Sequence, residues 1–487
     1  MPNHRAVVVI GAGISGLVCA FRLKMLGIDA LLIEQSDRVG GVIQSERVSD
    51  FLIERGPNSS QGTEELMSLV QELGITSELV EGDPKAPAYV YFKGRLHAVP
   101  SGPWAFIKST LLSLGGKLRI FKEPFLPVRR EAREESVAAF ARRRIGSEAA
   151  ERLVAPFVSG IYAGDANRLS VQAAFPKLAN LETGYGGLVR GMLAKAGEAR
   201  AARKSAAGAI DKSAPTRKRM ISFREGMGFL PKTLAQRLGE DLMVGCSDIR
   251  LRVADRNPSN QDAAGSEMVG GPPSVTFEVE FERASGRDRL SCDRIIIATP
   301  ARAAGALVAP LSDDLRRLLD EIEYPPLAIV SLAYKTSSIS ARLKGFGFLA
   351  APSEGLNILG CVWNSSLFAE RAPADTALLT VFIGGARKPE AARQVDAELV
   401  STAHSELQRV LGIASEPRVI AITRYERSIP QYNLGHAARV GTIERVLEGV
   451  PNLSLTGNYL HGVSTGDCIK EADRVAREVA RCLNGQP

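Results

Sequence analysis

The strongest candidate for chemistry in this sequence is a glycine-rich run near the N-terminus, Gly11-Ala12-Gly13-Ile14-Ser15-Gly16. It follows the apolar residues 6–10 and precedes a segment with helical periodicity at 17–26, so we expect a strand, a tight turn and a helix. In such a turn the glycines let the backbone approach a ligand closely, and amide groups at the helix N-terminus can bind a diphosphate. The run alone is weak support for a nucleotide site, because turns of this kind also occur without a ligand.

Two further features at defined spacing strengthen the prediction. Glu34 comes after seventeen intervening residues, at the end of a second predicted strand at 30–34, where a carboxylate can accept hydrogen bonds from ribose hydroxyls. Gly40 and Gly41 then form a second glycine turn, and Arg38 can add positive charge beside the same diphosphate. The spacing therefore predicts a dinucleotide whose adenosine carries a free 2′-hydroxyl.

The whole pattern resembles the FAD-binding signature of the glutathione-reductase-like flavoproteins, and in particular of amine oxidases, phytoene desaturases and protoporphyrinogen oxidases. The resemblance to oxygen-dependent protoporphyrinogen oxidases extends over nearly the whole chain, apart from residues 196–219 and 257–273. It implies FAD as the cofactor, rather than NAD. The segments that carry it are 91–100, 136–146, 159–165, 428–436, 457–459 and 466–469.

The same resemblance assigns cofactor contacts along the chain. A helix that starts near Thr465 would place the partial positive charge of its N-terminus near N1 and O2 of the flavin. The implied contacts are Gly11, Ala12, Gly13, Ile14, Ser15 and Gly16 for the diphosphate; Glu34 and Gln35 for the ribose; Arg38, Gly40 and Gly41 for the phosphate side; Gly56, Pro57, Asn58 and Ser59 for the flavin ring; Ile249 for the adenine; Ala298 and Thr299 for the end of a second contacting strand; Tyr425 as an aromatic residue near the flavin; and Val463, Ser464 and Thr465 for the helix amides under the isoalloxazine.

Substrate residues follow from the same family, in which a tetrapyrrole lies against the flavin in an apolar cavity. Gly160 and Ala163 are small enough to leave room for it. Leu327, Phe348 and Ile358 are candidate walls, although each is equally suited to a hydrophobic core.

The propionate groups of such a substrate require a cation. Many relatives carry an arginine shortly before the Leu96-His97 segment, whereas the aligned position here is Ala88. Arg95 or another basic residue would have to replace that arginine, so the position of the propionate anchor is left open.

The order of the predicted strands and helices, together with the family resemblance, indicates an α/β protein. We expect a glutathione-reductase-like FAD-binding Rossmann domain, an α+β substrate domain and an inserted helical, membrane-associating domain. A chain of 487 residues exceeds what one core usually organises. We expect the FAD-binding domain at 1–90, 221–300 and 440–487, the helical domain at 91–195, and the substrate domain at 301–439 with part of 50–90. Residues 196–220 are interpreted as a basic flexible insertion and 257–273 as a solvent-exposed loop within a hairpin.

Composition excludes several other classes of protein. Residues 190–219 hold nine Lys and Arg and two acidic residues, and this surplus of seven positive charges equals the net charge of the chain, +7. The rest of the chain is therefore neutral and gives no sign of nucleic-acid binding. Six cysteines without a CxxC pair argue against a zinc module or a disulfide scaffold and favour a reducing compartment. The histidines lack metal-ligand spacing and no GxSxG motif is present, so we predict neither a metal site nor a hydrolytic nucleophile.

The resemblance implies oxidation of protoporphyrinogen IX to protoporphyrin IX by six-electron dehydrogenation, with O2 as acceptor and H2O2 as product, in haem biosynthesis. No side chain is assigned as catalytic, because N5 of the flavin would accept the hydride. The alternatives are coproporphyrinogen III as the substrate, an amine oxidase or carotenoid desaturase reaction, and a non-enzymatic protein that binds prenylated partners like the Rab-escort proteins.

Membrane contact is implied by the family and by the composition of residues 103–127, where Trp104, Phe121 and Phe125 stand among Lys108 and Lys117. The alternative is that these apolar side chains line an internal cavity or a helical core. No run approaches the roughly 20 apolar residues that span a bilayer. We therefore expect a cytoplasmic protein, peripheral on the cytoplasmic face of the membrane, and a homodimer is compatible with the sequence.

Overall fold

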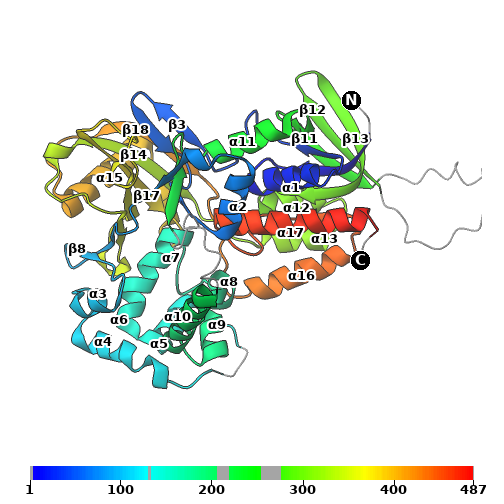
Figure 1. Ribbon diagram of the computed structural model, residues 1–487. Coiled ribbons are helices and arrows are strands. Elements are labelled where there is room, and N and C mark those ends of the chain that lie inside the picture. The colour runs from blue at the N-terminus through cyan, green and yellow to red at the C-terminus, as the bar shows by residue number, and fades with distance from the viewer. Residues whose placement is uncertain (1–3, 130–132, 206–218, 254–275, 486–487) are drawn as a thin grey trace, which may run out of the picture.

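The computed structural model describes residues 4–129, 133–205, 219–253 and 276–485. Figure 1 shows one sheet with its covering helices on the right, a second sheet at the upper left, and a group of helices, α3 to α10, at the lower left. Helix α7 (Ala155–Tyr162) lies between the second sheet and the other helices of that group. The chain therefore forms an α/β fold with two main sheets.

The first sheet combines a parallel part with an antiparallel extension. Its strands follow the order β10, β2, β1, β13, β12, β11. Strand β19 pairs with the C-terminal end of β13. Strand β13 is long enough to pair with β1 and β19 in parallel and, through its first half, with β12 in antiparallel fashion. The strands are β1 (His4–Ile10), β2 (Ala30–Ile33), β10 (Leu242–Met243), β11 (Ser247–Val253), β12 (Phe277–Arg283), β13 (Gly286–Ile297) and β19 (Leu453–Leu455).

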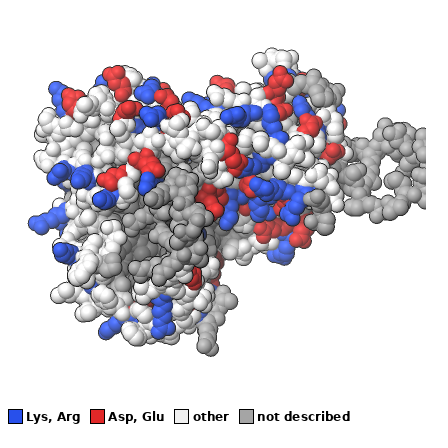
Figure 2. Space-filling model, viewed as in Figure 1, with Lys and Arg blue, Asp and Glu red and all other residues white. Residues whose placement is uncertain are grey.

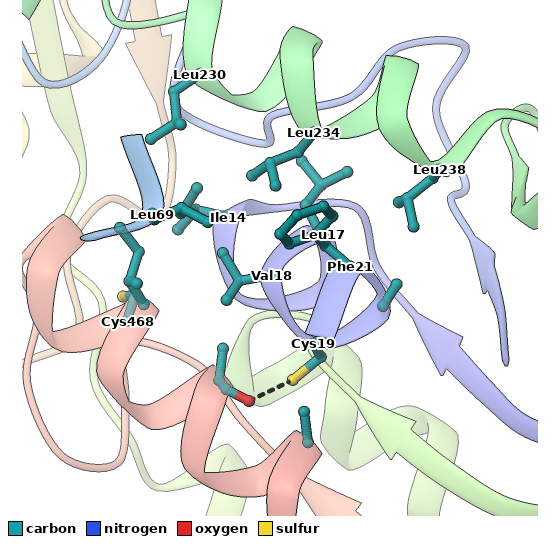
Figure 3. Close-up of a cluster of buried hydrophobic side chains, with 14 of the residues drawn as sticks. Ile14, Leu17, Val18, Cys19, Phe21, Leu69, Leu230, Leu234, Leu238 and Cys468 are labelled. Atoms are coloured by element: carbon teal, nitrogen blue, oxygen red, sulfur yellow. Dashed lines mark hydrogen bonds between the residues drawn. The ribbon is translucent and has the colours of Figure 1, made fainter. Parts of the chain in front are cut away.

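Both faces of this sheet are covered by helices, as its continuous apolar strands require. Val7 and Val9 of β1 pack with helices α1 (Ile14–Met25), α2 (Glu64–Glu72), α11 (Phe229–Leu238) and α17 (Thr465–Leu483). Figure 3 shows α1 between α11 and α17, with Leu17 and Phe21 directed toward Leu234. The helix predicted at 17–26 is therefore present and begins earlier.

The opposite face corrects one predicted boundary. Val8 and Ile10 pack with helices α12 (Ala301–Val308), α13 (Asp313–Asp320) and α16 (His436–Glu448). The sequence placed the substrate domain from residue 301, yet α12 and α13 complete the core of the first sheet. Their apolar residues are as suited to one sheet as to the other, so composition could not assign them.

The second sheet has the strand order β18, β14, β17, β16, β15, β7, β8, with β15 and β7 parallel and the other pairs antiparallel. One face is covered by α15 (Asp396–Leu411). Strands β7 and β8 belong to this sheet, whereas the sequence assigned residues from 91 onward to the helical domain. The strands are β7 (Ala88–Phe92), β8 (Arg95–Ala98), β14 (Leu327–Lys335), β15 (Gly347–Ala350), β16 (Ile358–Trp363), β17 (Thr376–Gly384) and β18 (Arg418–Tyr425).

The helical region runs from α3 to α10 and has its own buried cluster around Phe140, Val158 and Tyr432. Helix α10 continues to Ser205, well past the predicted start of a flexible insertion at 196, because Ala, Arg, Lys and Glu are strong helix formers. Among the described residues no helix is both long and apolar enough to cross a membrane. The elements are α3 (Pro103–Lys108), α4 (Leu114–Phe121), η2 (Glu123–Phe125), α5 (Val137–Ile145), α6 (Ser147–Ala149), η3 (Ala150–Val154), α7, α8 (Val171–Ala174), α9 (Pro176–Tyr185) and α10 (Leu188–Ser205).

Small strands join the main parts. Strand β3 (Ser45–Val48) pairs with β4 (Phe51–Glu54), and β9 (Met220–Phe223) pairs with β5 (Ser60–Gln61) and β6 (Leu79–Glu81). The remainder of the predicted basic insertion, 206–218, and the predicted loop at 257–273 lie outside the described residues. The hairpin around that loop is confirmed, because β11 and β12 pair in antiparallel fashion.

Candidate cofactor and substrate site

The first glycine turn is held in a shape that glycine alone permits at two positions. Gly11 has φ +103°, and a Cβ there would lie 2.9 Å from Thr299 Cγ2. A Cβ on Gly16 would lie 1.9 Å from the carbonyl oxygen of Gly11. Gly13, which caps α1, is different, since a Cβ there would meet nothing within 4 Å. The N-terminus of α1 therefore faces open space, which fits a diphosphate.

Glu34 is fixed beside this turn at the end of β2. One carboxylate oxygen accepts a hydrogen bond from the Ala12 amide at 2.6 Å. The other accepts from the amide and the hydroxyl of Ser36 at 2.9 and 2.7 Å. Gln35, between them, is exposed. The carboxylate thus has a defined orientation next to the start of α1, as ribose binding requires.

The second glycine turn packs against the first. The Gly40 amide donates to the Ala12 carbonyl at 2.8 Å, and a Cβ on Gly41 would lie 3.4 Å from Gly13 Cα. The Arg38 guanidinium donates to the Gly41 carbonyl at 3.0 Å. The structure therefore brings together the residues that the sequence assigned to the diphosphate.

A pocket of about 430 Å³ lies beside the second turn. Its charged residues are the cations Arg38, Arg55 and Lys232 and the carboxylates Asp37 and Glu46, which leaves positive charge in excess. That balance suits a phosphate group. The remaining lining residues are Val39, Ile43, Gln44, Ser45, Gly228 and Val244.

The strand with the predicted adenine contact starts beside Glu34, and the second predicted contacting strand ends beside the glycine turn. The Cys246 amide donates to the Glu34 carbonyl at 2.9 Å, so the loop before β11 borders the ribose carboxylate, and half-buried Ile249 lies on β11. The Ala298 amide donates to the Ile10 carbonyl at 2.8 Å. Thr299 Oγ1 is buried and has no hydrogen-bond partner among the described residues. An unsatisfied polar atom beside an open glycine turn fits a bound dinucleotide.

Three segments meet where the flavin ring was predicted. Residues Gly56, Pro57, Asn58 and Ser59 follow β4, and Asn58 is buried and accepts a hydrogen bond from Asn364 Nδ2 at 2.5 Å. The Tyr425 hydroxyl donates to the Arg55 carbonyl at 2.9 Å. Nearby polar atoms, Trp363 Nε1 and Asn364 Oδ1, are buried without a partner among the described residues. These contacts tie β18 and β16 to the loop that starts at Gly56.

The loop with Val463, Ser464 and Thr465 forms the start of α17. Ser464 is the N-cap: its Oγ accepts from the Asp467 amide at 3.1 Å and donates to the Asp467 carboxylate at 2.6 Å. A Cβ on Gly466 would lie 2.6 Å from Thr63 Oγ1, so this helix end touches the start of α2. Ser464 and Asp467 therefore form a reciprocal cap at this helix end.

A pair of stacked rings holds the chain just before α17. The Tyr432 hydroxyl accepts from the Gly462 amide at 2.8 Å and donates to the Asn458 carbonyl at 2.7 Å. His436 stacks on Tyr432 with ring centroids 4.0 Å apart. Burial, and then nearby Arg439, lower the pKa of His436 to about 4, so this ring is neutral at pH 7.

The predicted substrate residues divide between the two faces of the second sheet. Ala163, at the end of α7 with φ +47°, and Leu327 lie in one buried cluster with Ile329. Tyr425 borders the same cluster. The structure therefore brings together two of the predicted substrate residues and one predicted flavin neighbour.

Phe348 and Ile358 lie in a different place from the one predicted. Both belong to the buried cluster on the opposite face, under α15. Because side chains alternate along a strand, neighbouring residues point toward α7 instead. Leu359 and Phe382 border the Ala163 cluster, and a Cβ on Gly160 would lie 2.6 Å from Leu349 Cδ2. Leu349, Leu359 and Phe382 therefore lie on the side of α7, and the sequence analysis did not single them out.

Arg95 is exposed on β8, and strands β17, β16, β15 and β7 lie between β8 and Leu327 on β14. The structure therefore does not place Arg95 with the other predicted substrate residues. Ala88 is also exposed, at the start of β7.

Three features together define a dinucleotide-binding flavoprotein: the glycine turn before α1, the Glu34 carboxylate directly after β2, and the N-terminus of α17. The chain belongs to the family of flavin containing amine oxidoreductases, whose model matches residues 14–480. FAD is the cofactor, as predicted, and the donor set around Gly13 and Glu34 fits it.

Within that family the chain is similar to enzymes that act on porphyrinogens. It is 33% identical to the chloroplastic protoporphyrinogen oxidase of Nicotiana tabacum, over 98% of this chain and 86% of that protein. It is 27% identical to the coproporphyrinogen III oxidase of Bacillus subtilis (strain 168), over 96% of each chain. A crystal structure from Exiguobacterium sp. 255-15, described as a protoporphyrinogen oxidase, superposes with a TM-score of 0.77 at 22% identity over 99% of each chain, which shows the shared fold. The resemblance stated from the sequence is confirmed.

Proposed function

We propose that the protein is a flavin-dependent porphyrinogen oxidase that converts protoporphyrinogen IX to protoporphyrin IX in haem biosynthesis. The observation that carries this proposal is the near full-length likeness to protoporphyrinogen oxidases. FAD, when bound, supplies the hydride acceptor for each of three two-electron steps, and O2 is the proposed final acceptor, giving three H2O2.

The chain's own residues bind and orient the macrocycle in this proposal. Leu349, Leu359 and Phe382 present an apolar face toward α7, against which a flat tetrapyrrole can pack. The N-terminus of α17, capped by Ser464, directs partial positive charge toward the proposed flavin position. The buried cluster around Ala163 and Leu327 limits water at the reacting carbon and so favours hydride transfer to the cofactor. The pyrrole N–H proton that is lost with each hydride leaves to solvent, so no side-chain base is assigned.

The test is aerobic turnover by the purified protein, whose flavin spectrum is recorded first. Protoporphyrinogen IX and coproporphyrinogen III are compared by porphyrin fluorescence, with peroxide measured in parallel. Preferred oxidation of the first, with one H2O2 for each two-electron step, is expected. Preference for the second would support the activity that names the Bacillus subtilis relative, and a yellow protein inert on both would overturn the proposal.

We also propose that the surface formed by α3, α4 and η2 contacts a membrane containing anionic lipids, on its cytoplasmic face. Trp104 and Lys108 lie on α3 and Phe125 lies in η2; Trp104 is 78% exposed and Phe125 83% exposed. Leu111 and Leu112 are buried, so the predicted interfacial segment divides into a core part and a surface part. Figure 2 shows the lobe that contains α3 to α10 as mainly uncharged, with Lys or Arg side chains near its edge. The other exposed apolar residues of this surface are Ile107, Leu114, Leu118 and Phe121.

A further inference from the structure

A porphyrinogen carries carboxylates as well as an apolar ring, and the apolar face of the second sheet leads to a cation. Register pairs connect this face across five strands, because directly paired residues point to the same side of a sheet. The pairs run from Ile329 to Phe382, Gly360, Leu349 and Val90. Val90 packs with Phe92 and Leu111 in a separate small cluster at the outer end.

Arg152 of η3 lies at this outer end. Its guanidinium carbon is 4.3 Å from the centroid of the Phe92 ring, and Lys93 Nζ is 5.6 Å from the same centroid. Arg152 Nη1 donates to the Leu111 carbonyl at 3.0 Å and to the Glu148 carboxylate. Nε and Nη2 make no hydrogen bond to any described residue, and the side chain is 23% exposed. One edge of the guanidinium is therefore free for a carboxylate, which such a group can bind through two parallel N–H bonds.

The charge at this position favours an anion. Glu148 is held by the amide and hydroxyl of Ser113 at 2.7 and 2.6 Å. Burial acts to raise the pKa of Glu148, but these hydrogen bonds and the charges of Arg152 and Lys93 outweigh it and lower the pKa. Glu148 is therefore ionised at pH 7 and offsets one cation. Glu354 accepts from the Lys93 amide at 2.8 Å and offsets a second cation, whereas Arg95, which pairs with Phe92, adds a third. Arg152, Lys93 and Arg95 therefore leave one positive charge in excess.

The length of the helix that joins the two ends also fits. Ala163 comes eleven positions after Arg152, which corresponds to about 16 Å at 1.5 Å per helical residue. Ala163 lies beside Leu327 and Tyr425, at the end where the flavin is expected. A ring placed against Leu349 and Gly160 would therefore extend a propionate arm toward Arg152.

We propose that Arg152 binds a propionate carboxylate of the porphyrinogen, assisted by Lys93, in place of the arginine that relatives carry near Ala88. This inference rests on the proposed function and names its specificity-determining cation. Glu148 and Leu111 hold the guanidinium through Nη1 and Phe92 packs against it, which leaves the edge formed by Nε and Nη2 for the carboxylate.

Steady-state kinetics of the holoenzyme test the role of Arg152. In R152M we expect KM for the preferred porphyrinogen to rise ten- to a hundred-fold while kcat changes less than threefold, because the charge contributes to binding and does not touch the reacting carbon. R152K should recover part of the loss. R409M, at an exposed arginine of α15 on the opposite face of the second sheet, is the matched control and should behave as wild type. An unchanged KM in R152M, or a KM raised equally in R409M, would overturn the assignment.

A binding measurement separates recognition of the carboxylate from packing. Mesoporphyrin IX and its dimethyl ester are titrated into oxidised holoenzyme and followed by fluorescence. The wild type should bind the diacid at least tenfold more tightly, and R152M should lose this preference while its ester affinity stays the same. Equal loss for both ligands would show that Arg152 acts only by supporting Phe92.

If R152M does not fold, R152Q, which keeps a donor for Leu111, takes its place. Wild-type protein that oxidises no porphyrinogen would reject the proposed function, whereas an active wild type with normal R152M binding would reject only the anchor.

Discussion

Gly160 has no side chain at a point where α7 packs directly against Leu349. It lies inside α7, and the Cβ of an alanine would lie 2.6 Å from Leu349 Cδ2. Gly184, inside α9, is a matched control because a Cβ there would meet nothing within 4 Å.

We expect G184A to raise the free energy of unfolding by about 0.5–1 kcal/mol, the usual gain from replacing a helical glycine. G160A should lose that gain, since Leu349 must move, and its KM for porphyrinogen should rise about tenfold with an unchanged flavin spectrum. Urea unfolding and steady-state kinetics on both variants check this. Equal kinetics in the two variants would place Gly160 outside the substrate site.

His436 predicts a defined pH dependence of stability. Its pKa is about 4 in the folded protein and about 6.5 in the unfolded chain, so between these values the unfolded state binds more protons. Its contribution is therefore complete above pH 6.5 and is lost as pH falls toward 4, and it amounts to at most about 3 kcal/mol. Glu54, whose pKa burial raises to about 7, acts in the opposite direction over an overlapping range.

Urea unfolding of wild type and H436Q at pH 7 and pH 5 isolates the histidine, because Glu54 contributes equally to both proteins. The wild type should lose more free energy of unfolding between these pH values than H436Q does. Parallel pH dependence in the two proteins would contradict a neutral buried His436.

At the scale of elements, the sequence predicted what local physics controls. The turn from Gly11 to Gly16 and the carboxylate at Glu34 could be located because glycine conformation and strand ends leave local signals. The wall residues could not be assigned, because β14 is buried along nearly its whole length and both faces of its sheet are covered. When both faces of a sheet are apolar, the sequence predicts a strand but does not indicate which face a given side chain points to. The sequence analysis therefore named Phe348, whereas its neighbour Leu349 is the residue that faces α7.

The capped start of α17 carries an element-scale prediction. Ser464 and Ser312 both cap a helix, accepting hydrogen bonds from Asp467 and Leu315 amides at 3.1 and 3.2 Å. Replacing either by Ala should cost about 1 kcal/mol of unfolding free energy. Only S464A should also shift the reduction potential of the bound flavin to a lower value, because of these two helices only α17 is proposed to direct its N-terminus at the flavin ring. Spectroelectrochemistry on both variants measures this, and equal potentials would place the flavin elsewhere.

At the scale of the whole molecule, the sequence predicted a cofactor domain built from separated segments, with boundaries placed by composition. Helices α12 and α13 returned to the first sheet and strands β7 and β8 joined the second, since long-range packing decides which apolar surfaces meet. In the corrected arrangement three parts lie in a line: the cofactor turn, the apolar face under α7, and the outer end at Arg152. Arg152 contacts Leu111, which joins α3 to α4 in the chain, and α3 lies just below β8 in Figure 1.

That line ends on the exposed surface of α3, α4 and η2, which would let an apolar substrate pass directly from a bilayer. The chain holds two tryptophans, of which Trp104 is 78% exposed and Trp363 is 1% exposed. A blue shift of tryptophan emission on adding vesicles therefore reports on Trp104.

We expect this shift, and cosedimentation, with vesicles that contain phosphatidylserine, and both should weaken as salt increases because Lys108 and its neighbours contribute electrostatically. F125S should reduce binding several-fold, whereas M25S, at the exposed Met25 on α1, is the matched control and should bind as wild type. Turnover of detergent-dispersed substrate should stay normal in F125S, since the change affects the surface and not the cleft. Binding that is insensitive to F125S, or equally reduced by M25S, would show that the membrane does not meet the protein at this surface.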